Sequence, residues 1–234
     1  MSNIVSRILN NCTNYVQLDL PQACALCGAR AIGTALCPGC LADLPWLPPA
    51  HCPQCARPTP DGSLCGSCLR HPPAFSRSLA CFLYAPPIDG LIQQFKYGKN
   101  LHLARFFATH FAPQVANRTV DLILPMPLHP KRIKERGFNQ AIEIARPLAR
   151  GLGVPLMIDV AHRLRDTPAQ AGLPHDARLK NIKGAFVCDA RVKGKRVALL
   201  DDVMTTGASL NELARAALAA GAVEVEAWVV ARTL

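Results

Sequence analysis

The segment from Arg196 to Ser209 combines a buried-strand pattern with side chains that can hold a phosphorylated sugar. Its first five residues are mostly apolar, and two adjacent carboxylates, Asp201 and Asp202, follow them directly. A short loop with hydroxyl groups and one glycine comes next and leads into a helical pattern. Loop amides and a helix N-terminus favour a phosphate dianion, and carboxylates at a strand end can accept hydrogen bonds from ribose hydroxyls. We therefore expect a ribose 5-phosphate site, with the substrate-binding loop residues Thr205, Thr206, Gly207, Ala208 and Ser209.

Other interpretations of this segment either need motif residues that the sequence lacks or do not explain all the residues that are present. The sequence contains neither the G-x-x-x-x-G-K-[ST] loop of Walker-type nucleotide sites nor the G-x-G-x-x-G of dinucleotide folds. The structural alternative is a polar turn in which Asp202 or Thr205 caps the following helix. A capped turn accounts for one of these residues, but it gives no role to the Asp-Asp pair and the Thr-Thr-Gly-Ala-Ser run together.

A second constellation consists of cysteines at metal-ligand spacing. Eight of the eleven cysteines form four C-x-x-C pairs in two groups, and a shift of 28 residues places the first group on the second. Zinc needs four tetrahedral ligands, which two C-x-x-C turns supply. Segments this short cannot fold on apolar burial alone, so metal binding would supply the folding free energy. We expect two structural zinc sites, with one group per ion or with interleaved groups, from Cys24, Cys27, Cys37, Cys40, Cys52, Cys55, Cys65 and Cys68.

Disulfides are the main alternative for these cysteines. The start of the chain, residues 1–11, lacks the 7–15-residue apolar stretch of a signal peptide. We therefore expect a cytoplasmic location, where disulfides are rare. No apolar run approaches the ~20 residues that span a bilayer, so no membrane insertion is expected. Four thiolates leave no open position on zinc, which favours a module that packs on the main domain or docks a partner over catalysis at the metal.

Composition divides the chain near residue 73. Residues 1–73 hold ten of the 20 prolines, which excludes long helices there. We expect a double zinc ribbon in residues 20–73 and an α/β domain in residues 74–234. Residues 129–196 carry 15 Lys and Arg against 6 Asp and Glu, a net of +9 out of +10 for the chain. This concentration indicates a site for polyanions, either pyrophosphate or a nucleic-acid backbone, although a solvated surface is the alternative.

The elements that must position these residues alternate between strand and helix. Such alternation predicts a parallel sheet with helices on both faces, with ligands at the carboxyl ends of the strands. The expected strands are residues 78–84, 122–125, 156–161, 196–200 and 223–231. The expected helices are residues 88–97, 101–111, 139–152 (kinked at Pro147) and 209–220.

These motifs together resemble a known family. Residues 201–207 look like the phosphoribosyl pyrophosphate (PRPP) motif of type I phosphoribosyltransferases. The chain from about residue 20 to 234 is similar to the ComF/GntX family of competence-associated, phosphoribosyltransferase-like proteins. The resemblance implies a type I phosphoribosyltransferase-like sheet preceded by a small double zinc ribbon with four cysteines per zinc. The stretches that carry it, besides the cysteines, are Phe95–Gly98, Pro125–Leu128, Arg136–Gln140 and Ala231–Leu234.

The resemblance also implies roles for the site residues. It implies that PRPP binds with magnesium, and that residues 127–140 form the loop that faces the pyrophosphate. Residues 163–186 would correspond to the loop that closes over the site in this superfamily. The implied catalytic residues are Asp201, Asp202, Lys131 and Arg132, and further substrate-binding residues are Arg136, Gln170 and Arg178.

Two functions from different classes remain open at the level of the sequence. The first is an enzyme that transfers phosphoribose to an unidentified acceptor, associated with DNA uptake, competence or nucleotide salvage. The second is a non-catalytic protein that binds nucleotide or single-stranded DNA, with zinc ribbons that dock DNA-uptake or recombination proteins. No residue pattern identifies an acceptor pocket. A magnesium-dependent release of pyrophosphate would separate the two functions.

The cysteine spacing generates a first prediction. Protein purified without chelator should carry about two zinc ions per chain, because eight thiolates fill two tetrahedral shells. Elemental analysis of the purified protein checks this number. A protein that contains four disulfides and no zinc would contradict the prediction.

Overall fold

The computed structural model describes residues 21–98, 100–165 and 182–234. The chain divides into two compact units, Met1–Leu44 and Pro45–Leu234. The second group of cysteines therefore belongs to the same compact unit as the sheet. The domain ranges 20–73 and 74–234 stay predictions.

The first unit is a small hairpin followed by one turn of helix. Strands β1 (Pro21–Ala23) and β2 (Arg30–Ile32) pair antiparallel, and helix α2 covers Pro38–Ala42. The tight turn between the strands needs a left-handed residue, which Gly28 supplies with a φ of 75°. This turn and the start of α2 carry the first four cysteines of the repeat.

The second unit opens with the same pattern, 28 residues further along. The backbone N–H of Cys24 donates to the carbonyl of Ala29 at 2.7 Å, and that of Cys52 donates to Arg57 at 2.8 Å. A short helix again carries the second C-x-x-C pair, here α3 (Gly66–Arg70). The repeat in the sequence is thus a repeat of backbone hydrogen bonds. The helices of the proline-rich part span five residues each in the described residues, as the prolines predict.

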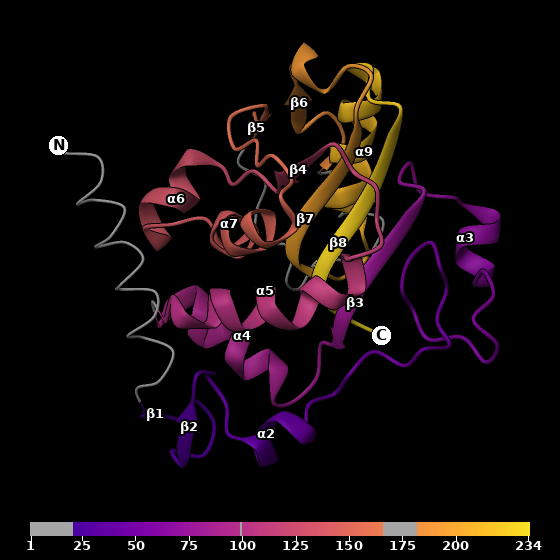
Figure 1. Ribbon diagram of the computed structural model, residues 1–234. Coiled ribbons are helices and arrows are strands. Elements are labelled where there is room, and N and C mark those ends of the chain that lie inside the picture. Colours follow the sequence, from indigo (N-terminus) through magenta and orange to yellow (C-terminus); the bar gives the residue numbers. More distant parts are fainter. Residues whose placement is uncertain (1–20, 99, 166–181) are drawn as a thin grey trace, which may run out of the picture. The chain divides into compact units, whose positions relative to one another are not determined.

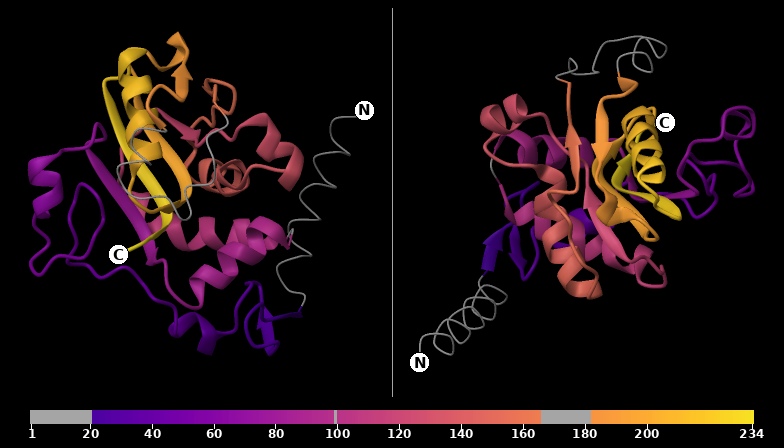
Figure 2. Two further views of the ribbon diagram at one scale, coloured as in Figure 1. Left: turned by 180° about the vertical axis from the view of Figure 1, so that it is seen from behind. Right: turned by 90° about the horizontal axis from the view of Figure 1, so that it is seen from above.

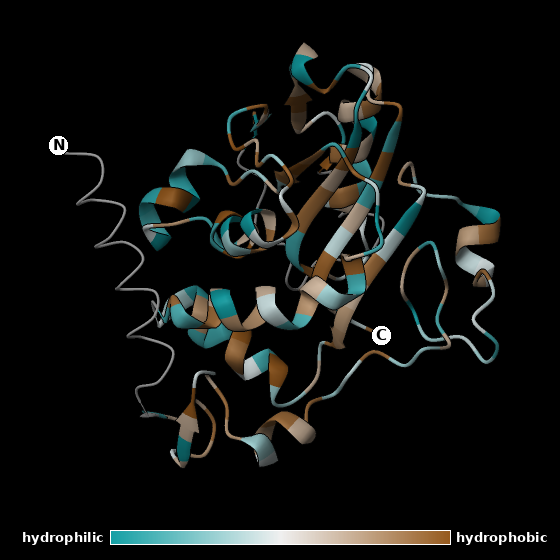
Figure 3. Ribbon diagram, in the orientation of Figure 1, coloured by the Kyte–Doolittle hydropathy of each residue, from teal (hydrophilic) through white to brown (hydrophobic). Residues whose placement is uncertain are grey.

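A four-stranded parallel sheet forms the centre of the second unit (Figure 1). The strand order is β3 (Arg77–Leu83), β8 (Glu224–Arg232), β7 (Arg196–Met204) and β4 (Leu122–Pro125). The two central strands are buried along most of their length and are largely hydrophobic (Figure 3). Continuous apolar runs are expected when both faces of a parallel sheet are covered.

Helices cover both faces of this sheet (Figure 2). Helices α5 (His102–Val115) and α7 (Gln140–Leu152) pack against each other on one face, and α9 (Ala208–Ala219) lies on the other. Helix α4 (Ile88–Tyr97) precedes α5 and buries its apolar side. The predicted α/β fold class is confirmed. The remaining elements are helix α6 (Pro130–Arg136), the 3-10 turn η1 (Ala190–Val192) and the antiparallel pair β5 (Ala161–Arg163) and β6 (Phe186–Cys188).

Several predicted elements match closely. Residues 88–97 and 122–125 form a helix and a strand with the predicted bounds. The side chain of Asn139 caps α7 by accepting the N–H of Ala141 at 2.9 Å, and the helix continues through Pro147 to Leu152.

Two strand predictions need correction. Strand β7 does not end before Asp201 but runs to Met204, because β8 continues to pair with it up to Met204 and Arg232. Residues 156–161 do not form one strand. Leu156 makes a single bridge to Ile123, and the chain then turns away so that the next strand pairs with Phe186–Cys188. Among residues 21–98, 100–165 and 182–234, no helix is long and apolar enough to cross a membrane.

Candidate functional site

The two adjacent carboxylates lie near the carboxyl end of β7, next to a lysine from another element. Asp202 is 7% exposed, and its Oδ2 lies 2.7 Å from the Nζ of Lys96 in the last turn of α4. Burial, the largest single effect, lowers the pKa of Lys96, but the charge and hydrogen bond of Asp202 together with the charge of Asp201 outweigh it, so the pKa is raised. Lys96 is therefore charged and compensates the carboxylate of Asp202.

Asp201 has no such counter-charge within hydrogen-bonding distance among the described residues. Its Oδ1 accepts the backbone N–H of Asp202 at 2.9 Å. Burial, together with the neighbouring charge of Asp202, raises the pKa of Asp201 to about 7. A carboxyl with a pKa this close to neutrality can hold or release a proton when a ligand arrives.

The predicted phosphate loop is shorter than expected and opens a helix. Because β7 runs to Met204, the loop consists of Thr205, Thr206 and Gly207, and α9 starts at Ala208. Gly207 has a φ of 78°, a left-handed conformation that suits glycine. The helix has no side-chain cap at Gly207, although Thr206 Oγ1 accepts the N–H of Ala208 at 3.3 Å. Neither Asp202 nor Thr205 caps the helix, so the capped-turn alternative does not describe this loop.

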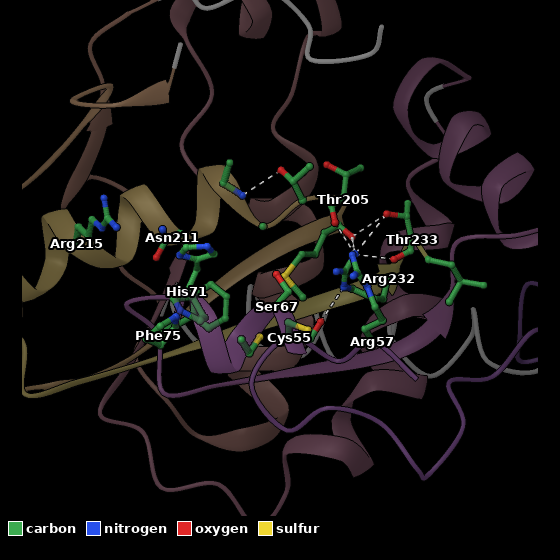
Figure 4. A pocket seen from close by; sticks show the side chains of 18 residues that line it. Cys55, Arg57, Ser67, His71, Phe75, Thr205, Asn211, Arg215, Arg232 and Thr233 are labelled. Atoms are coloured by element: carbon green, nitrogen blue, oxygen red, sulfur yellow. Dashed lines mark hydrogen bonds between the residues drawn. The ribbon is translucent and has the colours of Figure 1, made fainter. Parts of the chain in front are cut away.

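A buried arginine at the end of β8, Arg232, donates hydrogen bonds to the backbone of this loop (Figure 4). Arg232 is 2% exposed, and its Nη1 donates to the carbonyl oxygens of Met204 at 3.0 Å, of Thr205, and of Thr233 at 2.6 Å. Its Nε donates to the carbonyl of Cys55 at 2.7 Å. Burial lowers the pKa of Arg232. One side chain thus joins the phosphate loop to the second group of cysteines.

Basic residues of α6 gather near Lys96. A hollow of about 190 Å³ is lined by Lys96, Tyr97, Arg132, Glu135 and Arg136. The guanidinium of Arg136 lies 5.4 Å from the ring centre of Tyr97 and donates to Gln140 Oε1 at 3.1 Å. The predicted residues Arg132 and Arg136 are therefore brought together, whereas Lys131 lies in the first turn of α6 and does not line the hollow.

The amide of Gln140 is a further polar group beside Arg136. Gln140 is 3% exposed, and its Nε2 is buried with no hydrogen-bond partner among the described residues. A buried donor without a partner is costly, which favours a ligand or water at this position.

Each group of four cysteines has the geometry of a zinc site. The four sulfur atoms of each group lie within 4.8 Å of one another. Zn–S bonds of about 2.3 Å in a tetrahedron place sulfur atoms about 3.8 Å apart. The Sγ atoms of Cys27 and Cys37 are 3.7 Å apart, and those of Cys55 and Cys65 are 3.6 Å apart. The thiolates fit zinc with one group per ion, and the interleaved alternative is not observed.

Two predicted site residues lie outside the described residues, and two residues that contact the site were not predicted from the sequence. Gln170 and Arg178 lie outside the described residues. Lys96 and Arg232 were not predicted as site residues, although both lie in stretches that carry the family resemblance. Their roles depend on which elements meet at the end of β7, which no local pattern reveals.

Two family models match the chain. A double zinc ribbon domain matches residues 15–69, and a phosphoribosyl transferase domain matches residues 139–233. The second match contains the carboxylate pair, the phosphate loop and Arg232. The two matched regions contain the cysteine clusters and most of the predicted phosphoribosyl site.

Known relatives cover most of the chain. The DNA utilization protein YhgH of Escherichia coli is 36% identical over 191 residues, which cover 78% of this chain and 84% of that protein. Competence protein F of Haemophilus influenzae is 33% identical over 208 residues, covering 84% and 90%. Among solved structures, a purine phosphoribosyltransferase from Pyrococcus horikoshii matches with 18% identity and a TM-score of 0.37, covering 55% of this chain and 82% of that one.

The raised pKa of Asp201 generates a prediction about stability. A carboxyl with a raised pKa binds protons more tightly in the folded state, so stability should fall as the pH rises from about 4 to about 7. Asp201→Asn should remove this slope and stabilise the ligand-free protein by roughly 1–3 kcal/mol at pH 8. Urea unfolding at pH 5 and pH 8 measures the difference. An equal effect of the variant at both pH values would contradict the assignment.

The contacts of Arg232 generate a prediction about the loop. Cys52→Ser should disrupt the second cysteine group and so weaken the hydrogen bond from Arg232 to the carbonyl of Cys55. Hydrogen exchange at the amides of residues 205–207 should then increase. Cys24→Ser is the matched control, because Cys24 lies in the first compact unit. Hydrogen exchange followed by mass spectrometry compares the two variants. Equal protection of the loop in both variants would show that Arg232 does not transmit the disturbance.

Proposed function

Because the chain belongs to the ComF/GntX family of competence-associated, phosphoribosyltransferase-like proteins, we propose that it binds PRPP with magnesium and transfers the phosphoribosyl group to an acceptor. The observation that carries this proposal is the joint placement of the carboxylate pair, the glycine-containing loop and the start of α9 at the end of β7. In this arrangement the loop amides bind the 5-phosphate and the carboxylates accept hydrogen bonds from the ribose hydroxyls.

The pyrophosphate group would lie on the side of Lys96 and α6. Arg132 and Arg136 line the hollow there with Lys96, and the unpartnered Nε2 of Gln140 lies in the same region as Arg136. Positive groups that are already in place stabilise the charge that develops on a leaving pyrophosphate. Magnesium would be held by the pyrophosphate and ribose oxygens near Asp201 and Asp202, and it would neutralise the leaving group.

The residues of this chain then have distinct tasks in the transfer. Asp202 is paired with the ammonium group of Lys96 at 2.7 Å, which fixes its position for a hydrogen bond from a ribose hydroxyl. When Asp201 is protonated, it releases its proton to solvent as the ligand binds, and its negative charge then favours the positive charge that develops on the ribose ring. Positioning and electrostatic stabilisation carry most of the catalysis in such a mechanism.

Binding of single-stranded DNA is the second candidate function. The concentration of +9 net charge in residues 129–196 supports it, because phosphate contacts with Lys and Arg dominate nucleic-acid affinity. Two of these cations, Arg132 and Arg136, line the hollow assigned to pyrophosphate, so DNA bound there would compete with PRPP. We favour the transferase, because the basic cluster alone gives no role to the carboxylate pair.

The proposal is tested by the affinity for PRPP in the presence of magnesium. Replacing Asp201 and Asp202 together by Asn keeps their shape and removes two charged acceptors. Such hydrogen bonds contribute roughly 1.5–3 kcal/mol each, so affinity should fall by on the order of tenfold or more. Gly207→Val should weaken binding further, because its φ of 78° strains a β-branched residue. Calorimetry on folded variants gives the affinities.

The matched control for the double substitution is Asp159→Asn with Asp189→Asn. These two carboxylates pair with Arg191 away from the loop, so PRPP affinity should not change. Pyrophosphate release with candidate acceptors then separates transfer from binding alone. Unchanged affinity in both loop variants would reduce residues 201–209 to a turn without a ligand.

A further inference from the structure

The side chain of Lys96 belongs both to the carboxylate pair and to the hollow assigned to pyrophosphate. Its Nζ lies 2.7 Å from Asp202 Oδ2, and the same side chain lines the hollow. It is 20% exposed, so it is neither fully enclosed nor free in solvent. A lysine carries its charge on a flexible four-carbon stem, and its ammonium can therefore move between neighbouring anions without a change in the backbone.

Charges of both signs act on this ammonium. Burial is the largest effect on the pKa of Lys96 and lowers it, the charges of Asp202 and Asp201 raise it, and the charge of Arg136 lowers it. In the ligand-free protein the carboxylates thus attract the ammonium, and the basic side of the hollow repels it. A diphosphate bound in the hollow would turn this repulsion into attraction, because its negative charge exceeds the positive charge of one guanidinium.

The hollow keeps a basic wall while Lys96 is engaged with Asp202. The guanidinium of Arg136 donates to Gln140 Oε1 at 3.1 Å and lies 5.4 Å from the ring centre of Tyr97, so two neighbours hold it in place. Arg132 lines the same hollow. Guanidinium groups suit phosphate oxygens, so this wall can receive a diphosphate before the ammonium of Lys96 reaches it.

A divalent cation and the ammonium would compete for the same carboxylate. Magnesium sites use one or two carboxylates together with substrate phosphates, with metal–oxygen distances of about 2.0–2.1 Å. In the ligand-free protein Oδ2 of Asp202 is already in contact with the Nζ of Lys96. A metal ion bound at this oxygen, directly or through a water molecule, would meet the ammonium at a distance where like charges repel strongly.

We propose that Lys96 is the resident counter-ion of the carboxylate pair and keeps free divalent cations out of the ligand-free site. A diphosphate in the hollow draws the ammonium away from Asp202, and the metal ion enters together with that ligand. Lys96 thus makes the loading of metal conditional on the anion. The identity of the ligand rests on the proposed function, whereas the exclusion of free metal does not depend on it.

The test measures metal binding without any phosphate compound. Manganese is the probe, because free Mn²⁺ gives a paramagnetic resonance signal that is lost on binding. The zinc-loaded wild-type protein is compared with Lys96→Met, which keeps the length of the side chain and removes its charge. Lys195→Met is the matched control, because Lys195 is exposed and directly precedes β7, at the other end of that strand from Asp202. Zinc content and circular dichroism check the folding of each variant.

Lys96→Met should bind about one Mn²⁺ per chain, roughly tenfold or more tightly than the wild-type protein, because the carboxylates then face the metal without the ammonium. Lys195→Met should behave as the wild-type protein does. Adding Asp202→Asn to Lys96→Met should abolish the gain. The inference is overturned if Lys96→Met and the wild-type protein bind Mn²⁺ equally, or if the gain persists with Asp202→Asn. Lys96→Gln, a neutral side chain that can still donate to Asp202, provides the same comparison if Lys96→Met does not fold.

The affinity for PRPP should change in the opposite direction. With saturating Mn²⁺, calorimetry should show Lys96→Met binding PRPP about tenfold or more weakly than the wild-type protein, because the diphosphate loses a charged donor. A merely structural defect would weaken the binding of metal and of PRPP together. Unchanged PRPP affinity in Lys96→Met would contradict the movement of the ammonium to the diphosphate. Failure of the wild-type protein to bind PRPP would contradict the proposed function, while the manganese comparison would still decide the role of Lys96.

Discussion

The site depends on how the protein accommodates two adjacent carboxylates near the end of a buried central strand. Like charges in neighbouring positions repel each other, and burial makes each charge more expensive. Lys96 compensates Asp202 at 2.7 Å, and Asp201 is left with a pKa raised to about 7. The ligand-free protein thus keeps a carboxyl with a raised pKa where a ribose hydroxyl would bind. Raised carboxyl pKa values are typical of functional sites.

The loop after these carboxylates is fixed by contacts from distant parts of the chain. Arg232 donates to the carbonyls of Met204 and Thr205 on one side and of Cys55 on the other. The Nε and Nη1 groups of this buried guanidinium donate to carbonyl oxygens from separate parts of the chain, which holds these parts in one arrangement. The second cysteine group is therefore joined through Arg232 to the loop that we propose to bind phosphate. The two halves of the repeat have the same pattern of backbone hydrogen bonds, and the second half belongs to the compact unit that contains the sheet.

The sequence predicts well those features that local chemistry determines. The cysteine spacing alone indicates two four-thiolate groups, and the sulfur distances of 3.7 and 3.6 Å agree with it. The alternation of strands and helices and the presence of a loop before α9 follow from local patterns as well. The extension of β7 to Met204 does not, because it depends on pairing with β8.

Lys96 and Arg232 escaped prediction for the same reason. Lys96 is 106 residues away from Asp202 in the sequence, and Arg232 is 177 residues away from Cys55. Only the order of the strands brings each pair together. In the sequence, a lysine at the end of an amphipathic helix looks like an ordinary surface residue. An arginine in an apolar strand looks like a residue that must be solvent-exposed. The structure gives each of them a charged or polar partner at the site.

The most direct test of this account is the number of protons released when PRPP and magnesium bind. Calorimetry at pH 7 in buffers of different ionisation enthalpy measures that number. With a pKa of about 7, Asp201 is about half protonated before binding, and in the proposed mechanism it ionises so that a ribose hydroxyl donates to a charged oxygen. We expect about half a proton to be released by the wild-type protein beyond that released by Asp201→Asn. Equal proton release by the two proteins, or no binding by either, would contradict the central role given to this carboxylate pair.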